Sequence, residues 1–145
     1  MRGMTRRVSR SVVVWSCVLL GVVAAHDLTH AFDDGLQTGL GEFAFVAVPQ
    51  WLVLAVVLAV IVRGDRAQGA AAAVLLGISV TVGLAVIHLL PFALASYWAL
   101  QPSVVSWVLA WSPAVLGFAL AAFAWSQWRP AARPRREVAP GTRAA

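Results

Sequence analysis

The sequence predicts an all-α, polytopic membrane protein whose helices form a four-helix transmembrane bundle of up-down-up-down topology. Composition is the first reason: 61% of the 145 residues are hydrophobic and only 12% are charged, whereas ordinary globular chains hold about 45–50% and about 25%. Length is the second, because a soluble domain of this size has too little interior to bury so many apolar side chains. Pattern is the third, since the apolar residues fall into four runs without a charged residue.

The four runs are expected to form helices near residues 9–30, 42–62, 68–95 and 103–128, which together make one transmembrane domain over residues 1–128. A helix needs about 20 apolar residues to cross the hydrocarbon, and the last three runs meet that length. The first run, Ser11–Ala25, reaches it only with its flanks. Because the connections are short, helices that follow each other should be antiparallel neighbours.

The two ends of the chain carry further predictions. Residues 1–25 also fit a cleaved signal peptide, with arginines first, an apolar run next and small residues before His26. Both alternatives place His26 outside the cell, and both stay open. Residues 129–145 are rich in Arg, Pro and Ala and are expected to be a disordered basic tail.

The arginines predict the orientation in the membrane. All eleven basic residues are Arg; they lie in residues 1–10, 63–66 and 129–143, and none lies in residues 26–42 or 91–102. Positively charged connections stay in the cytoplasm. Both termini and the 63–66 connection are therefore expected there, in a cytoplasmic membrane. The net charge is +5, and the basic ends of the chain are expected to contact the anionic headgroups of the bilayer. No nucleic acid partner is predicted.

Small residues recur at helical spacing in the last two runs. The third run has them at every fourth position, at Gly69, Ala73, Gly77, Thr81 and Ala85, and the fourth offers Ala110, Ala114, Gly117 and Ala121. Small residues let helices approach closely in lipid. These ridges are interpreted as packing seams, either within the chain or toward a second copy or a larger membrane protein.

All three histidines and most of the acidic residues are expected at the outer boundary. His88 lies nineteen residues after Gly69, roughly 28 Å along a helix, which is close to the full thickness of the hydrocarbon. If the first helix continues past Ala25, His26 and His30 lie on one face, and two His four residues apart can chelate one metal ion. The expected ligands are His26, His30, His88, Asp33 and Glu42, with Asp27 and Asp34 as hydrogen-bond partners of the imidazoles.

Imidazole and carboxylate ligands suit Zn²⁺, Cu²⁺ or Fe²⁺. A haem held by His88 and either His26 or His30 is the less favoured cofactor, because it would not need the carboxylates. One observation opposes the cluster: Gly21 and His26 lie about 140° apart on an ideal helix. If Gly21 marks the packed face, or if the helix ends at Ala25, the expected register of the histidines is lost.

The predicted function is binding of a divalent metal at the outer face, for sensing, delivery or transport. The alternative is a non-enzymatic accessory or structural subunit that packs against a membrane partner. A third hypothesis is a membrane metallohydrolase, because His26-Asp27-Leu28-Thr29-His30 resembles the HExxH string of zinc metalloproteases. Asp27 is one methylene shorter than the Glu of that string, so it would have trouble reaching a metal-bound water as a general base. The protein is therefore not expected to be an enzyme.

Overall fold

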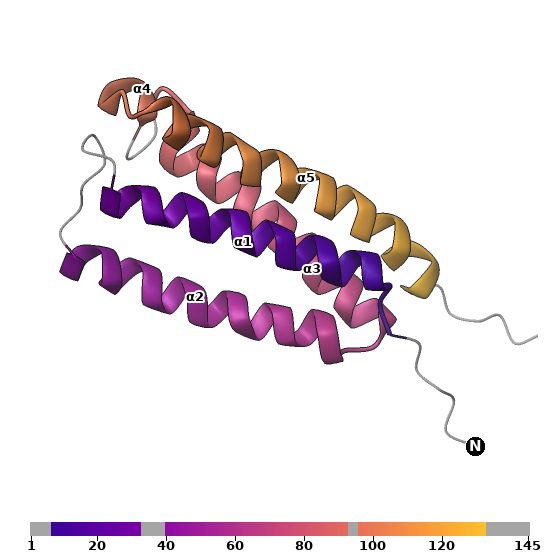
Figure 1. Ribbon diagram of the computed structural model, residues 1–145. Helices are drawn as coiled ribbons and strands as arrows, with labels where there is room; N and C mark the ends of the chain where they lie inside the picture. Colours follow the sequence, from indigo (N-terminus) through magenta and orange to yellow (C-terminus); the bar gives the residue numbers. More distant parts are fainter. Residues whose placement is uncertain (1–6, 33–39, 93–95, 133–145) are drawn as a thin grey trace, which may run out of the picture.

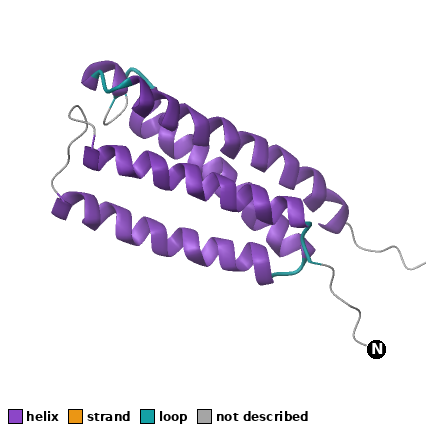
Figure 2. Ribbon diagram, viewed as in Figure 1, coloured by secondary structure: helices purple, strands orange, loops and turns teal. Residues whose placement is uncertain are grey.

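The computed structural model describes residues 7–32, 40–92 and 96–132, in which helices are joined by short loops and no strand occurs (Figure 2). The helices are α1 (Arg10–Phe32), α2 (Leu40–Arg63), α3 (Arg66–Leu84), the π-helical turn η1 (Ala85–Leu89), the short α4 (Tyr97–Leu100) and α5 (Val104–Ala132). The prediction of an all-α chain is confirmed for this part of the chain.

The four long helices, α1, α2, α3 and α5, lie side by side in an elongated bundle (Figure 1). The most extensive packing is between α3 and α5, and α1 contacts all three of the others. The C-terminal end of α1, the start of α2, η1 and α4 lie at one end of the bundle, and the start of α3 and the C-terminal end of α5 lie at the other (Figure 1).

Three helical segments are long and apolar enough to cross a membrane: Arg10–His30, Arg66–Leu89 and Val104–Arg129. Within α2 the apolar stretch that qualifies is shorter, Ala47–Arg63. Large apolar side chains also cover the outside of the bundle, where Val56 and Leu75 are each 65% exposed and Phe118 is 69% exposed. A soluble monomer rarely exposes so continuous an apolar surface, so the chain is suited to a membrane.

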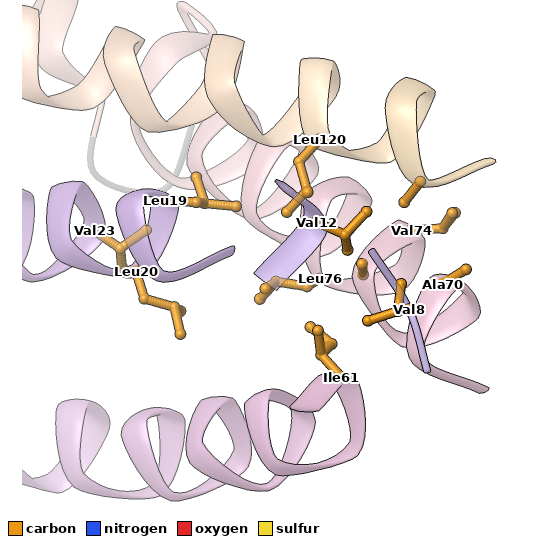
Figure 3. Close-up of a cluster of buried hydrophobic side chains, with 12 residues drawn as sticks. Val8, Val12, Leu19, Leu20, Val23, Ile61, Ala70, Val74, Leu76 and Leu120 are labelled. Atoms are coloured by element: carbon orange, nitrogen blue, oxygen red, sulfur yellow. The ribbon is translucent and has the colours of Figure 1, made fainter. Parts of the chain in front are cut away.

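The buried core joins side chains from all four long helices (Figure 3). Val12 and Leu19 of α1, Ile61 of α2, Leu76 of α3 and Leu120 of α5 are each no more than 3% exposed. The side chains of this cluster are aliphatic, so they contribute packing, and the hydroxyl of the buried Ser16 beside them donates to the carbonyl oxygen of Val12.

The ridges of small residues form a seam between α3 and α5. A Cβ added at Gly77 would collide with the carbonyl oxygen of Gly117 and would lie 2.9 Å from the backbone nitrogen of Ala121. Thr81 Oγ1 donates across the seam to the carbonyl oxygen of Ala114 at 2.8 Å. Because backbones approach this closely only where side chains are absent or small, these positions serve contacts within the chain.

A tight connection joins α2 to α3. Asp65 caps the N-terminus of α3: its Oδ1 accepts from the backbone N–H of Gln68 at 2.8 Å, and the backbone N–H of Asp65 donates to Gln68 Oε1 at 3.2 Å. This reciprocal pair satisfies donors that a helix start leaves open, so the chain reverses direction within the two residues between Arg63 and Arg66.

The third helix is shorter than predicted. It was expected to continue to residue 95, but regular helix gives way to η1 at Ala85 and helical structure ends at Leu89. Pro91 explains the end, since proline has no N–H to donate and disfavours the helical conformation in the residue before it. Leu90 is accordingly extended, with φ −80° and ψ 145°. The short helix α4 was not predicted, and α1 extends to Phe32. The tail after residue 132 lies outside the described residues.

Candidate metal centre

The first helix carries a buried stripe that ends at the histidines. Its buried positions include Val12, Ser16, Leu19, Val23 and His26, spaced alternately by four and three residues, which is the spacing of one helix face. His30 follows four residues later and is partly buried. The helix therefore continues past Ala25 in the register that metal chelation requires.

Gly21 does not mark the packed face of α1. It is exposed, and a Cβ added to it would meet nothing within 4 Å. The objection raised by the 140° between Gly21 and His26 is thus removed, because the two residues do lie on different faces and His26 is on the inner one. The sequence could not show this stripe, because nearly every residue from 11 to 25 is apolar and no face of the helix stands out.

The π-helical turn η1 supplies the third imidazole. The backbone N–H of Leu90 donates to the carbonyl oxygen of Ala85, five residues back, at 3.1 Å. This wider turn rotates the residues that follow relative to a regular α-helix, and such turns often occur at functional sites. His88 lies within it and is only 5% exposed.

The three imidazoles come together at one end of the bundle. Ring centroids are 5.3 Å apart for His26 and His30, 5.1 Å for His26 and His88, and 5.1 Å for His30 and His88. Each ring offers one nitrogen such that the three nitrogens lie within 4.8 Å of one another. Nitrogens bound to one tetrahedral zinc ion at about 2.0–2.1 Å are roughly 3.4 Å apart. Binding one ion would therefore require the rings to close by at most roughly 1.4 Å.

One buried nitrogen in the cluster lacks a hydrogen-bond partner. His26 is 2% exposed, and its Nδ1 contacts no donor or acceptor among the described residues. A buried polar atom without a partner costs free energy, and native proteins rarely keep one without a reason. A metal ion bound to one of the two ring nitrogens of His26 would fix which nitrogen carries the hydrogen.

Of the acidic residues predicted at the site, the structure describes the side chain of Asp27 alone. Asp27 Oδ2 accepts from Trp51 Nε1 at 2.8 Å and from Gln50 Nε2 at 3.5 Å, so this carboxylate joins α1 to α2. It also interacts electrostatically with His30. Asp33 and Asp34 lie outside the described residues, as does the side chain of Glu42, whose backbone belongs to α2.

Aromatic side chains pack against the imidazoles, and one of them, Tyr97, was not singled out from the sequence. Tyr97 of α4 is fully buried, and its ring centroid lies 4.7 Å from that of His88 and 6.3 Å from that of His26. Trp107 of α5 packs edge-on against Tyr97 with centroids 5.5 Å apart. Sequence spacing gave no signal for Tyr97, because its place depends on how the chain returns after Pro91.

The close packing of the rings bears on the cofactor. A haem iron with two histidine ligands lies between two rings on opposite sides of a wide, flat macrocycle. Here all three rings pack against one another at 5.1–5.3 Å, so a macrocycle between any two would have to displace the third. A single small ion needs no such space, and three imidazoles are a common set of ligands for one.

Comparisons of the chain with protein-family models, with curated proteins and with solved structures find no match. The function has to be inferred from the geometry of the chain itself.

Proposed function

We propose that the protein is a small multipass membrane protein that binds a divalent transition-metal ion through His26, His30 and His88 at the outer end of its bundle. One observation carries this proposal. Imidazoles from α1 and from η1, separated by more than fifty residues in the chain, offer nitrogens within 4.8 Å of one another. His26 Nδ1, buried and without a hydrogen-bond partner in the described residues, supports it.

The metal is an ion of intermediate softness, such as Zn²⁺ or Cu²⁺. Three neutral imidazoles suit Zn²⁺ and Cu²⁺, whereas Ca²⁺ and Mg²⁺ prefer sites built from oxygens. Fe²⁺ commonly takes two His and a carboxylate, a set that differs from the three imidazoles that lie together here. Asp27, close enough to act on His30, would offset part of the charge of the ion.

The position of the site favours capture, sensing or delivery of the ion over its passage through the bundle. The buried polar side chains of the described residues are Ser16, His26, His88, Ser96 and Ser106. Only Ser16 lies in the apolar core, and its hydroxyl donates to the carbonyl oxygen of Val12 at 2.8 Å. An ion that left the cluster toward the opposite end would lose its ligands in a region of low polarity, where bare charge is costly.

We further propose that four helices span the membrane, with both termini in the cytoplasm. At about 1.5 Å per residue, the 24 residues of α2 are roughly 36 Å long, which suffices for a span. The described arginines belong to the start of α1, the connection from α2 to α3 and the end of α5, which lie together opposite the histidines (Figure 1). Arginines on the cytoplasmic side agree with the usual charge bias of membrane proteins.

The first test is the metal content of the full chain purified in detergent. Elemental analysis should find about one zinc or copper ion per chain, or the chain should bind one when it is added. A site occupied at 100 times its dissociation constant raises the free energy of unfolding by about 2.7 kcal/mol. A chain that purifies without metal and gains no thermal stability from Zn²⁺ or Cu²⁺ contradicts the metal site and leaves the accessory-subunit hypothesis.

Metal binding should weaken as the pH falls. Imidazole has an ordinary pKa of about 6.5, and a protonated ring cannot bind a metal. Protons therefore compete with the ion for ring nitrogens, and between pH 7.5 and pH 5 the affinity should drop by at least about tenfold. Isothermal titration with Zn²⁺ at several pH values measures this, and an affinity that does not change with pH would exclude imidazole ligands.

The orientation can be tested by labelling cysteines in intact cells. In a Cys17→Ala background, Gln101→Cys should react with a thiol reagent that cannot cross the membrane, and Gln68→Cys should not. Both glutamines are exposed, so any difference in labelling reflects the side of the membrane. Labelling of Gln68→Cys alone would show that the termini lie outside.

A further inference from the structure

We propose that Tyr97 is the fourth ligand of the metal ion, through its phenol oxygen. This inference rests on the proposed function, since it concerns the same site. Three imidazoles leave a four-coordinate ion with one open position. Among the described residues, the ring contacts of the cluster bring in one further side chain with an oxygen, which is Tyr97.

The position of Tyr97 is fixed from both sides along the chain. The hydroxyl of Ser96 donates to the carbonyl oxygen of Leu90 at 3.1 Å, and Trp98 Nε1 donates to the carbonyl oxygen of Leu89 at 2.9 Å. Both acceptors directly follow His88 in the chain. The helix end that holds the third imidazole therefore also holds α4, and Tyr97 keeps its place beside His88.

Packing on the other side prevents Tyr97 from turning outward. The ring of Trp107 lies perpendicular to that of Tyr97, at 90° and 5.5 Å, and Trp98 in turn packs against Trp107 at 5.1 Å. Tyr97 is 0% exposed and its hydroxyl oxygen is closed off from solvent. The imidazoles of His26 and His88 are its ring neighbours, so the phenol is held within this cluster of rings.

Binding of the phenol oxygen as an anion would reduce the positive charge that is buried at the site. A divalent ion with three neutral imidazoles keeps its full charge of +2, and burying an uncompensated charge is costly. The carboxylate of Asp27, which accepts from Trp51 and Gln50, offsets part of this charge from beside His30. When the ion binds Tyr97, the O–H bond breaks, the oxygen–metal bond forms and the proton leaves to the solvent. The anionic oxygen then lowers the net charge of the ion and its four ligands to +1.

The single tyrosine makes a sharp test possible. Tyr97 is the only tyrosine of the chain, so every tyrosinate signal belongs to it. Tyrosinate bound to Cu²⁺ gives an intense visible absorption by charge transfer, which imidazole ligands alone do not give. The full chain in detergent, loaded with one Cu²⁺, should show this band. Tyr97→Phe should lose it, and Trp15→Phe, an exposed aromatic earlier on α1, should keep it.

The outcomes separate this inference from the proposed function. A wild-type chain that binds one Cu²⁺ without the charge-transfer band overturns the tyrosinate ligand and leaves the three-histidine site intact. A chain that binds no Cu²⁺ and no Zn²⁺ overturns both. Should Tyr97→Phe fail to fold, resonance Raman spectra of the wild-type copper complex decide instead: tyrosinate modes that shift when the chain is made with ring-deuterated tyrosine support the ligand, and their absence contradicts it.

Discussion

Replacement of any one of His26, His30 and His88 by Ala should remove most metal binding, and a second replacement should add little. The expected loss of affinity for each single variant is at least about 100-fold, more than the 10–100-fold that follows from losing only a hydrogen-bond partner of a ligand. The reason is geometric. The ligands act together on one ion, and two imidazoles no longer enclose it. Titration of the full chain with Zn²⁺ or Cu²⁺ measures the loss.

The double variant His26→Ala/His88→Ala distinguishes shared binding from separate roles. Residues that hold one ion show strong coupling in a double-mutant cycle, whereas distant and independent residues add. Leu28→Ala is the matched control, since Leu28 lies between His26 and His30 but is 55% exposed. If the three single variants have small and additive effects on metal affinity, similar to that of the control, the imidazoles do not share an ion.

Gly77→Leu should destabilise the bundle more than any comparable change on the outside of α3. A Cβ at this position collides with the carbonyl oxygen of Gly117 and comes within 3.0 Å of the Cβ of Ala121. Backbone cannot give way as a flexible side chain does, so α3 and α5 have to move apart. Overpacking costs about 1–3 kcal/mol in soluble cores, and the larger value is expected here. Thermal unfolding in detergent measures it.

Gly83 offers the control on the same helix. A Cβ added to Gly83 meets nothing within 4 Å. Alanine is favoured over glycine in helices by about 1 kcal/mol, so Gly83→Ala should be neutral or stabilising in the same assay. Gly77→Ala should be destabilising despite that preference. Equal stability of Gly77→Leu and the wild type would mean that α3 and α5 do not pack through Gly77.

The apolar runs determined the fold class on their own. Helix formation inside a membrane satisfies every backbone hydrogen bond within the segment, so a long uncharged run has few other structures to adopt. The helix seams were also accessible to sequence reasoning. The spacing of four that places Gly77 and Thr81 on one face of α3 is a local property of the helix, and the structure packs that face against α5 through Gly77 and Thr81.

The histidine cluster could be predicted only in part. His26 and His30 lie four apart on one helix, so their shared face follows from the sequence once the helix continues. Asp27 could not be placed in the same way. The sequence suggested that it holds an imidazole, whereas its carboxylate accepts from Trp51 of α2. Which helix lies beside α1 at that depth is decided by packing over the whole bundle.

Only the tertiary structure decided how the site is closed. The π-helical turn at Ala85–Leu89 changes the direction of His88. The hydrogen bond that closes this turn, from the backbone N–H of Leu90 to the carbonyl oxygen of Ala85, depends on the path of the chain at Pro91. Tyr97 reaches the cluster because α4 folds back onto that same helix end. Sequence patterns report positions along one element with a fixed period. They carry no information on contacts between irregular segments, and it is these contacts that bring Tyr97 to the imidazoles.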